Sequence, residues 1–186
     1  GIDLPADQQI GGVLSENPAL FNKPRNLVAA ADGTFYVTDT ENHRIVHLDS
    51  TGRVINSWGS FADSSKGQAP GGTFFEPWSI AIGLDGSIFV ADTWNHRIQK
   101  FSADGEFITM WGYFGQAEAP EAFWGPRAVV VDSSGRVIVS DTGNKRIVIF
   151  NDQGSYIGQF GDTGMQPGEF NEPTGLAIGP DGTLYV

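Results

Sequence analysis

The chain has 186 residues, of which 40% are hydrophobic and 12% aromatic, and its 22 acidic and 11 basic residues give a formal net charge of -11. This composition excludes an intrinsically disordered chain, and the length fits one domain. The negative charge repels a phosphate backbone and argues against nucleic acid as a partner. The chain has no cysteine, which excludes a disulfide framework, a thiolate metal site and a Cys nucleophile. No run of about 18 apolar residues occurs, so we expect no membrane insertion by this segment.

Two short apolar runs open the chain, at Ile2–Leu4 and Ile10–Leu14, with the polar turn ADQQ between them. We interpret them as two strands joined by a turn. A much stronger pattern follows, in which a proline opens each of four successive units that begin roughly 50 residues apart. The fourth unit holds only its first part within these residues. The opening prolines are Pro24, Pro77, Pro126 and Pro173.

Each complete unit contains four short segments rich in β-branched and aromatic residues, which is the pattern of antiparallel strands rather than of helices. The first segment is small and almost wholly apolar, which predicts an innermost strand buried on both faces. An Asp-Gly or Ser-Gly pair follows it and suits a tight hairpin. Four such strands per unit predict the blade of a β-propeller. The expected strands cover residues 26–30, 34–39, 44–48 and 54–59, then 79–83, 87–92, 97–101 and 107–112, then 128–132, 136–141, 146–150 and 156–161, and finally 175–179 and 183–186.

The motif Asp-Thr-x-Asn-x-Arg-Ile recurs at 39–45, 92–98 and 141–147, in the hairpin between the second and third strands. Asp and Asn side chains bond neighbouring backbone N–H groups in turns. The planar donor fork of each Arg suits a carboxylate or carbonyl, and we expect it to fix one blade to its neighbour. An active site is normally single, whereas this pattern returns in every blade, so we favour a structural role. The motif residues are Asp39, Asn42, Arg44, Asp92, Asn95, Arg97, Asp141, Asn144 and Arg146.

These residues resemble the NHL repeat, whose signature is matched by Asn42–Arg44 and Asn95–Arg97, while the third copy departs from it with Lys145. The resemblance covers residues 21–186 and extends to the opening Phe and Pro, the Asp-Gly turn and the closing Trp-Gly or Phe-Gly. It implies a disc, usually of six blades around a channel, that most often serves as a platform for partners. It does not by itself imply an enzyme.

We therefore expect an all-β chain, a β-propeller of four-stranded antiparallel blades that forms an incomplete ring with three full blades and split N- and C-terminal parts. An open ring leaves unpaired strand edges, so we expect the split parts to meet within one chain or between two. This predicts a homo-oligomer or a fragment of a longer propeller. The expected units are a segment at 1–20 that completes a blade, blades at 21–74, 75–122 and 123–169, and a partial blade at 170–186.

The connections between blades and the Asp-Thr-x-Asn tips share one face of a propeller, where loops carry function more often than strands do. Positions that vary between repeats on this face hold three tryptophans and two arginines. Such residues suit the stacking of sugar rings or aromatic and cation contacts with a peptide. The alternative is that the tryptophans only pack between blades. The candidate binding residues are Arg25, Trp78, Trp94, Trp124, Arg127 and Thr174.

The predicted function is a non-catalytic binding or scaffolding propeller that presents this face to a protein, peptide or glycan, with no catalytic residue, metal site or cofactor. The alternative is a metal-assisted propeller enzyme, a lyase or hydrolase with ligands at the channel, as some related propellers are. The only histidines of this chain are His43, His47 and His96. Zinc needs three or four converging ligands, which argues against a zinc site built on these histidines. RNA binding, which some family members show, conflicts with the acidic charge. The sequence does not fix the localisation of the protein, and we slightly favour an extracellular or cell-surface location.

Overall fold

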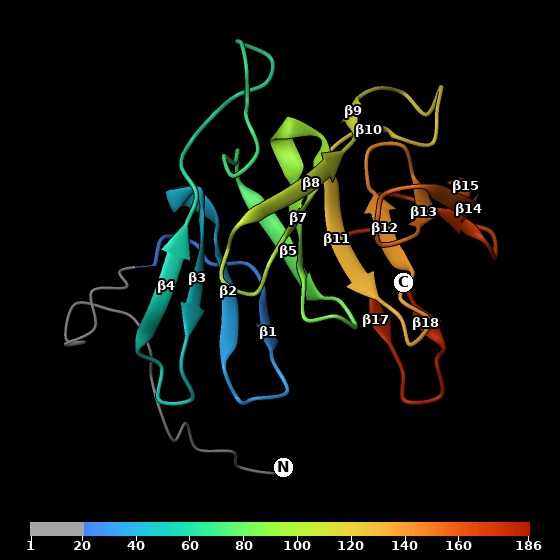
Figure 1. The fold of residues 1–186 in the computed structure, drawn as a ribbon. Helices are drawn as coiled ribbons and strands as arrows, with labels where there is room; N and C mark the ends of the chain where they lie inside the picture. Colours follow the sequence, from blue (N-terminus) through green and yellow to red (C-terminus); the bar gives the residue numbers. More distant parts are fainter. Residues whose placement is uncertain (1–20) are drawn as a thin grey trace.

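The computed structural model describes residues 21–186, which form three four-stranded antiparallel sheets standing side by side and a short C-terminal hairpin (Figure 1). Strands in each large sheet follow one another in chain order, so each sheet is one blade. The blades are β1 (Leu27–Ala29), β2 (Phe35–Asp39), β3 (Arg44–Leu48) and β4 (Val54–Trp58); β5 (Pro77–Ile82), β6 (Ile88–Asp92), β7 (Arg97–Phe101) and β8 (Phe107–Trp111); and β11 (Pro126–Val131), β12 (Val137–Asp141), β13 (Arg146–Phe150) and β14 (Tyr156–Phe160).

The C-terminal hairpin consists of β17 (Ala177–Ile178) and β18 (Leu184–Tyr185), which pair antiparallel as the start of a further blade. The predicted all-β class and four-stranded antiparallel blades are confirmed. The two strands expected before residue 21 lie outside the described residues. Within residues 21–186, no helix is long and apolar enough to span a membrane.

The tight hairpins arise from local turn chemistry. Between β5 and β6, the Asp85 carboxylate accepts the backbone N–H of Ser87 at 3.0 Å, and Gly86 has a φ of +80°. A short carboxylate side chain can bond the backbone two residues further on, and glycine tolerates positive φ without steric cost. The chain therefore reverses within a few residues and brings neighbouring strands into register.

The connections between blades contain short elements that the sequence pattern did not predict. Two of them are two-stranded parallel ladders, and a single parallel bridge joins Phe61 to Phe74 at the corresponding place in the first connection. These ladders hold both ends of each connection together. The ladders are β9 (Tyr113–Phe114) with β10 (Ala122–Phe123) and β15 (Asp162–Thr163) with β16 (Glu169–Phe170). The 3-10 turns η1 (Thr40–Asn42) and η2 (Thr93–Asn95), also unpredicted, lie within blades, between the second and third strands.

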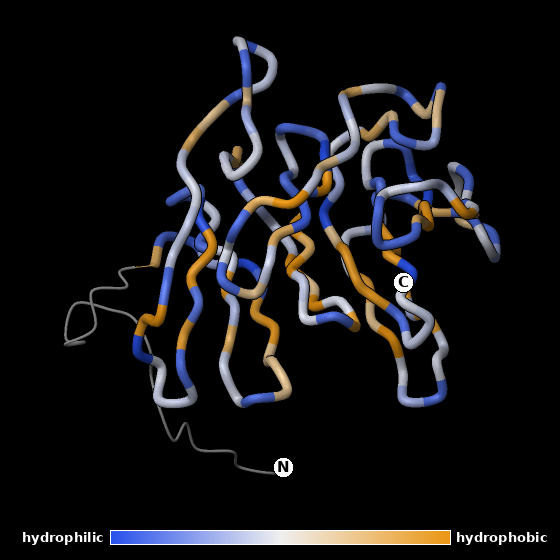
Figure 2. The backbone as a smooth tube through the Cα atoms, in the orientation of Figure 1, coloured by the Kyte–Doolittle hydropathy of each residue, from blue (hydrophilic) through white to orange (hydrophobic). Residues whose placement is uncertain are grey.

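The hydrophobic core lies between adjacent blades. Trp58 ends the outer strand β4, and its ring centroid is 5.8 Å from that of Phe101 in the next blade. Trp111 at the end of β8 is 5.7 Å from Phe150 in the third blade. Both phenylalanines are fully buried, and the hydrophobic strand segments appear orange in Figure 2. These contacts give the repeated tryptophans at the ends of the outer strands a packing role between blades.

The first strands differ in burial. Burial was predicted for all of them, and β5 and β11 are mostly buried, whereas Leu27 in β1 is 55% exposed. The prediction was wrong for β1 and also for β17, whose Ala177 is exposed. Among the described residues, only the second blade packs beside β1, and no complete blade follows β17. A strand of this type is buried by sheets on both sides, so β1 marks the open side of the incomplete ring.

Candidate binding face

The loops fall on two sides of the molecule (Figure 1). The loop face, at the top of the view, holds the turns between second and third strands and the connections between blades. The hairpin face, at the bottom, holds the tight hairpins. The loop face comprises residues 40–43, 59–76, 93–96, 112–125, 142–145 and 161–172, and the hairpin face comprises residues 30–34, 49–53, 83–87, 102–106, 132–136 and 151–155.

A buried aspartate organises each blade on the loop face. In the second blade, one Asp92 oxygen accepts the backbone N–H of Phe75 at 2.7 Å. The other oxygen accepts Asn95 Nδ2 at 3.0 Å, Arg97 Nε at 2.8 Å and Gln99 Nε2 at 2.9 Å. Burial raises the pKa of the Asp92 carboxyl, against the opposing effect of the Arg97 guanidinium. The carboxylate thereby joins the turn before the opening proline to the second and third strands.

The Asp-Asn-Arg part of this network occurs in the other two blades, where Val46 and Val148 stand in the place of Gln99. Asp39 accepts the backbone N–H of Asn22 at 2.7 Å, and Asp141 accepts that of Trp124 at 2.7 Å. In each blade the motif Asn and Arg bind the second carboxylate oxygen. These contacts are Asn42 Nδ2 at 2.9 Å and Arg44 Nε at 2.7 Å on Asp39, and Asn144 Nδ2 at 2.8 Å and Arg146 Nε at 2.8 Å on Asp141.

The remaining guanidinium donors of Arg97 and Arg146 bind the connection that arrives from the preceding blade. Arg97 donates to the carbonyl of Thr73 at 2.8 Å, and Arg146 donates to that of Ala122 at 2.8 Å. Both arginine side chains are at least nine-tenths buried. The hydrogen bonds of these two guanidinium groups are thus made within the protein.

The threonine of each Asp-Thr pair links one blade to the next, a role that sequence reasoning missed. Its hydroxyl is buried and donates to the carbonyl of the proline that opens the following blade. The only signal in the sequence was the recurrence of this threonine in every motif. The bonds run from Thr40 to Pro77 at 2.8 Å, from Thr93 to Pro126 at 2.8 Å and from Thr142 to Pro173 at 2.6 Å.

The two motif histidines form a second link between blades. His43 Nδ1 accepts the backbone N–H of Glu76 at 3.1 Å, and His96 Nδ1 accepts that of Gly125 at 3.0 Å. An imidazole can accept at Nδ1 only when it is neutral. Burial lowers the pKa of both histidines, while nearby carboxylates, Glu76 first for His43 and Asp63 for His96, act in the opposite direction. Lys145 occupies this place in the third blade and cannot accept such a bond.

Three of the predicted binding residues meet on the loop-face ends of the inner strands. Trp78 follows the opening proline of the second blade, and Arg25 and Arg127 follow those of the first and third. The guanidinium carbon of Arg25 is 3.7 Å from the centroid of the Trp78 ring, and that of Arg127 is 4.5 Å from it. The equivalent Thr174 is exposed and takes no part in this stack.

Trp94, Trp124 and Arg127 line one cleft of about 490 Å³ on the loop face. Trp94 Nε1 donates to a Glu76 carboxylate oxygen at 3.0 Å, which fixes the indole. Trp124 is 43% exposed, and its face packs where Gly143 has no side chain. The cleft also contains Lys145, so aromatic surface and cationic groups lie together in it.

Two exposed phenylalanines extend this aromatic surface and were not among the predicted residues. Phe61 is 54% exposed and Phe114 is 56% exposed, and each ring lies 4.9 Å from the ring of a motif histidine. Phe114 also lies 6.2 Å from Trp124. Their equivalent position, three residues after Trp58 and Trp111, would have revealed the pair in the sequence.

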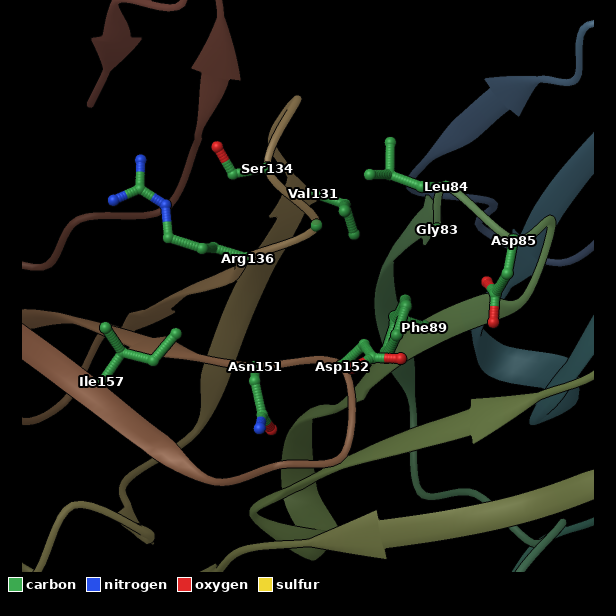
Figure 3. A pocket seen from close by; sticks show the side chains of 11 residues that line it. Gly83, Leu84, Asp85, Phe89, Val131, Ser134, Arg136, Asn151, Asp152 and Ile157 are labelled. Carbon is green, nitrogen blue, oxygen red and sulfur yellow. The ribbon is translucent and has the colours of Figure 1, made fainter.

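The hairpin face has a pocket of about 300 Å³ between the second and third blades, shown in Figure 3. Leu84, Asp85 and Arg136 line it together with Asp152. The buried Lys100 ammonium is 3.4 Å from an Asp85 oxygen and 3.2 Å from an Asp152 oxygen. This ion pair network joins the second blade to the third. No group of three or more His, Asp or Glu side chains among residues 21–186 is placed to hold a metal ion.

A family model described as NHL repeat matches residues 21–48, 74–101 and 123–150. Each match begins at the phenylalanine before the opening proline and ends with the third strand of a blade. The chain carries three NHL repeats at these positions. The Asp network, the threonine link and the histidine link described above are therefore features of its NHL repeats.

The chain is 31% identical over 111 residues to peptidylglycine alpha-amidating monooxygenase from Rattus norvegicus, an alignment that covers 57% of this chain and 11% of that protein. It is 30% identical over 112 residues to NHL repeat-containing protein 3 from Homo sapiens, covering 58% of this chain and 30% of that protein. The chain thus spans less than a third of either relative. Among solved structures, a streptogramin B lyase superposes with a TM-score of 0.64 at 21% identity, covering 87% of this chain and 47% of that one, which shows the fold alone.

Proposed function

We propose that this NHL-repeat chain is a non-catalytic binding or scaffolding propeller whose loop face receives a protein, peptide or glycan. The observation that carries the proposal is the cleft of about 490 Å³ lined by Trp94, Trp124 and Arg127. A cleft of this size with a few aromatic and polar groups is typical of ligand sites. The repeated Asp, Asn and Arg residues bind one another and the backbone, whereas these variable residues present side chains to solvent.

The test is binding of the protein to a glycan array and a peptide array, followed by alanine variants. Trp94→Ala and Trp124→Ala should weaken binding to the recognised ligand about tenfold or more, because each removes a large aromatic contact area. Leu84→Ala is the matched control, since this residue is 70% exposed but lies on the hairpin face. Binding that survives both tryptophan variants, or that fails in Leu84→Ala, would refute the assignment to this face.

The alternative function is a metal-assisted lyase or hydrolase. It is favoured by the relatives whose names describe amidating enzymes and by the fold shared with a streptogramin B lyase. Metal analysis of the purified protein separates the two functions. A stoichiometric, tightly held Zn²⁺ would support the enzyme, and purified protein that binds its ligand after chelation would support the binding propeller.

The open ring leads to a further part of the proposal. Leu27 and the two-stranded C-terminal sheet present surface that additional strands would cover in a closed propeller. We propose that a second copy, or other parts of a longer protein, supply them, with blades at 21–74, 75–122 and 123–169 and a partial blade at 170–186. Light scattering at low protein concentration checks this, and a compact, stable monomer would count against it.

A further inference from the structure

The two arginines beside Trp78 come from different blades and are brought together by the radial arrangement. Arg25, Trp78 and Arg127 each follow an opening proline, so they occupy one repeat position on three consecutive inner strands. Both guanidinium carbons lie within 4.5 Å of the same ring centroid. Trp78 thus contacts two cations, which come from different blades, through its indole ring.

This pair of cations is only weakly neutralised by the protein. The nearest carboxylate oxygen to Arg127 belongs to Glu172, at 4.0 Å, and the Glu172 side chain is 66% exposed. Arg25 forms no ion pair with any carboxylate among residues 21–186. Like charges in proximity repel one another. The chain has twice as many acidic as basic residues, yet at the loop-face ends of the inner strands Arg25 has no ion pair among the described residues and Arg127 has only the 4.0 Å contact with the exposed Glu172.

The arginine donors remain accessible in this arrangement. A guanidinium that stacks on an aromatic ring uses its face, whereas its N–H groups lie in its plane and match a carboxylate or phosphate. Arg25 is exposed, and 23% of the Arg127 side chain is exposed. An anion placed at the edge of the indole can therefore approach the free donors of these arginines.

We propose that Arg25 and Arg127, held by Trp78, form a binding site for a carboxylate of a peptide ligand. This inference rests on the proposed function of the loop face. A single carboxylate fits the local pair of cations, whereas a polyanion such as a nucleic acid would also meet the overall charge of -11. Arg127 additionally lines the cleft with Trp94 and Trp124. The favoured ligand therefore carries an aromatic or apolar side chain next to its carboxylate.

The test compares two small probes that differ only in charge, N-acetyl-phenylalanine with its free carboxylate and N-acetyl-phenylalaninamide. Binding is followed at low ionic strength, where ion pairs are least screened, through the indole N–H signal of Trp78 in ¹H–¹⁵N spectra. The signal is assigned with Trp78→Phe. Acetate and inorganic phosphate, titrated separately, distinguish a carboxylate site from a phosphate site.

We expect the acid to bind the wild-type protein at least about tenfold more tightly than the amide, as two ion pairs allow. In Arg25→Gln/Arg127→Gln this preference should vanish. Lys66→Gln is the matched control, because it removes one positive charge from an exposed side chain on the same face and should leave the preference intact. Near-UV circular dichroism checks that each variant is folded, and the comparison of the two probes on wild-type protein stands without any variant.

Equal affinity for acid and amide, or no Trp78 shift at tens of millimolar acid, would overturn the proposal. It would also fail if the arginine variant kept the preference, or if phosphate shifted the signal and acetate did not. If acid and amide bind equally but Trp124→Ala abolishes both, the loop face is still a binding face and only the carboxylate site is wrong. If Trp124→Ala and the arginine variant both leave binding unchanged, the proposed function itself fails.

Discussion

The buried aspartate of the second blade offers the sharpest test of how these repeats are held together. Asp92→Asn keeps the shape of the side chain but replaces one carboxylate oxygen with an NH₂ group. In the native protein one oxygen of Asp92 accepts three side-chain donors, from Asn95, Arg97 and Gln99. The Asn amide has one acceptor oxygen and one NH₂ group, which donates. Whichever way the amide is turned, its NH₂ group would face either the Phe75 N–H or the three side-chain donors.

The expected loss of unfolding free energy is about 3–5 kcal/mol, the cost of leaving one partner of a buried ion pair unpaired. The geometry supports a value in this range, because Asp92 is fully buried and the Arg97 side chain is 6% exposed. Asp39→Asn is the matched variant in the first blade. There the Arg44 side chain is 28% exposed, so water can solvate it and the loss should be clearly smaller.

Urea denaturation followed by tryptophan fluorescence measures both variants, and an unchanged slope m establishes that the difference is one of stability. Typical stabilities of 5–15 kcal/mol mean that Asp92→Asn should shift the midpoint greatly while the protein still folds. A loss below about 1 kcal/mol would refute the account of this network as a buried, charge-dependent anchor. Equal losses in the two variants would show that burial of the arginine does not set the cost.

Three further predictions concern glycine geometry and the links between blades. In denaturation experiments, Gly112→Ala should lower the free energy of unfolding by several kcal/mol, because a Cβ there would lie 2.6 Å from the Phe123 ring. Gly86→Ala should lower it by only about 1 kcal/mol, because a Cβ at that position meets nothing within 4 Å. Thr93→Val should cost about 1–3 kcal/mol, since it leaves the carbonyl of the next opening proline without its donor; an unchanged midpoint would contradict the link. The pKa values of His43 and His96 lie below the unfolded value of about 6.5, so their contribution to stability is complete above that pH and is lost as the pH falls toward the folded values. Double replacement of these histidines by Gln should flatten the stability profile below about pH 6.5, and an equally steep profile would rule out the histidine link.

Much of the fold could be predicted because its signals are local. The segments rich in β-branched and aromatic residues and the Asp-Gly turns act within a single hairpin, and each of the twelve blade strands overlaps the range that the pattern predicted. The exposure of Leu27 was not predictable in this way, because it depends on which sheet lies beside β1. The parallel ladders, such as β9 with β10, also escaped prediction, since they are pairs of only two residues in loops.

The candidate site shows the same division. The sequence identified Trp78, Arg25 and Arg127 as variable residues at one repeat position, but not that both cations stack on one indole. It also indicated a structural role for the Asp-Thr-x-Asn-x-Arg motif without revealing that Thr93 and His96 bind the following blade. Their partners are a backbone carbonyl and a backbone N–H, groups that nearly every residue carries and that leave no trace in the sequence.

The sequence by itself determined the repeat, its strands and its turns, because β-branched and aromatic segments and turn residues act over a few neighbouring positions. Only the tertiary structure decided which side chains from different repeats meet, because that depends on how whole blades pack beside one another. Residues some fifty positions apart are brought together on the loop face by that packing alone.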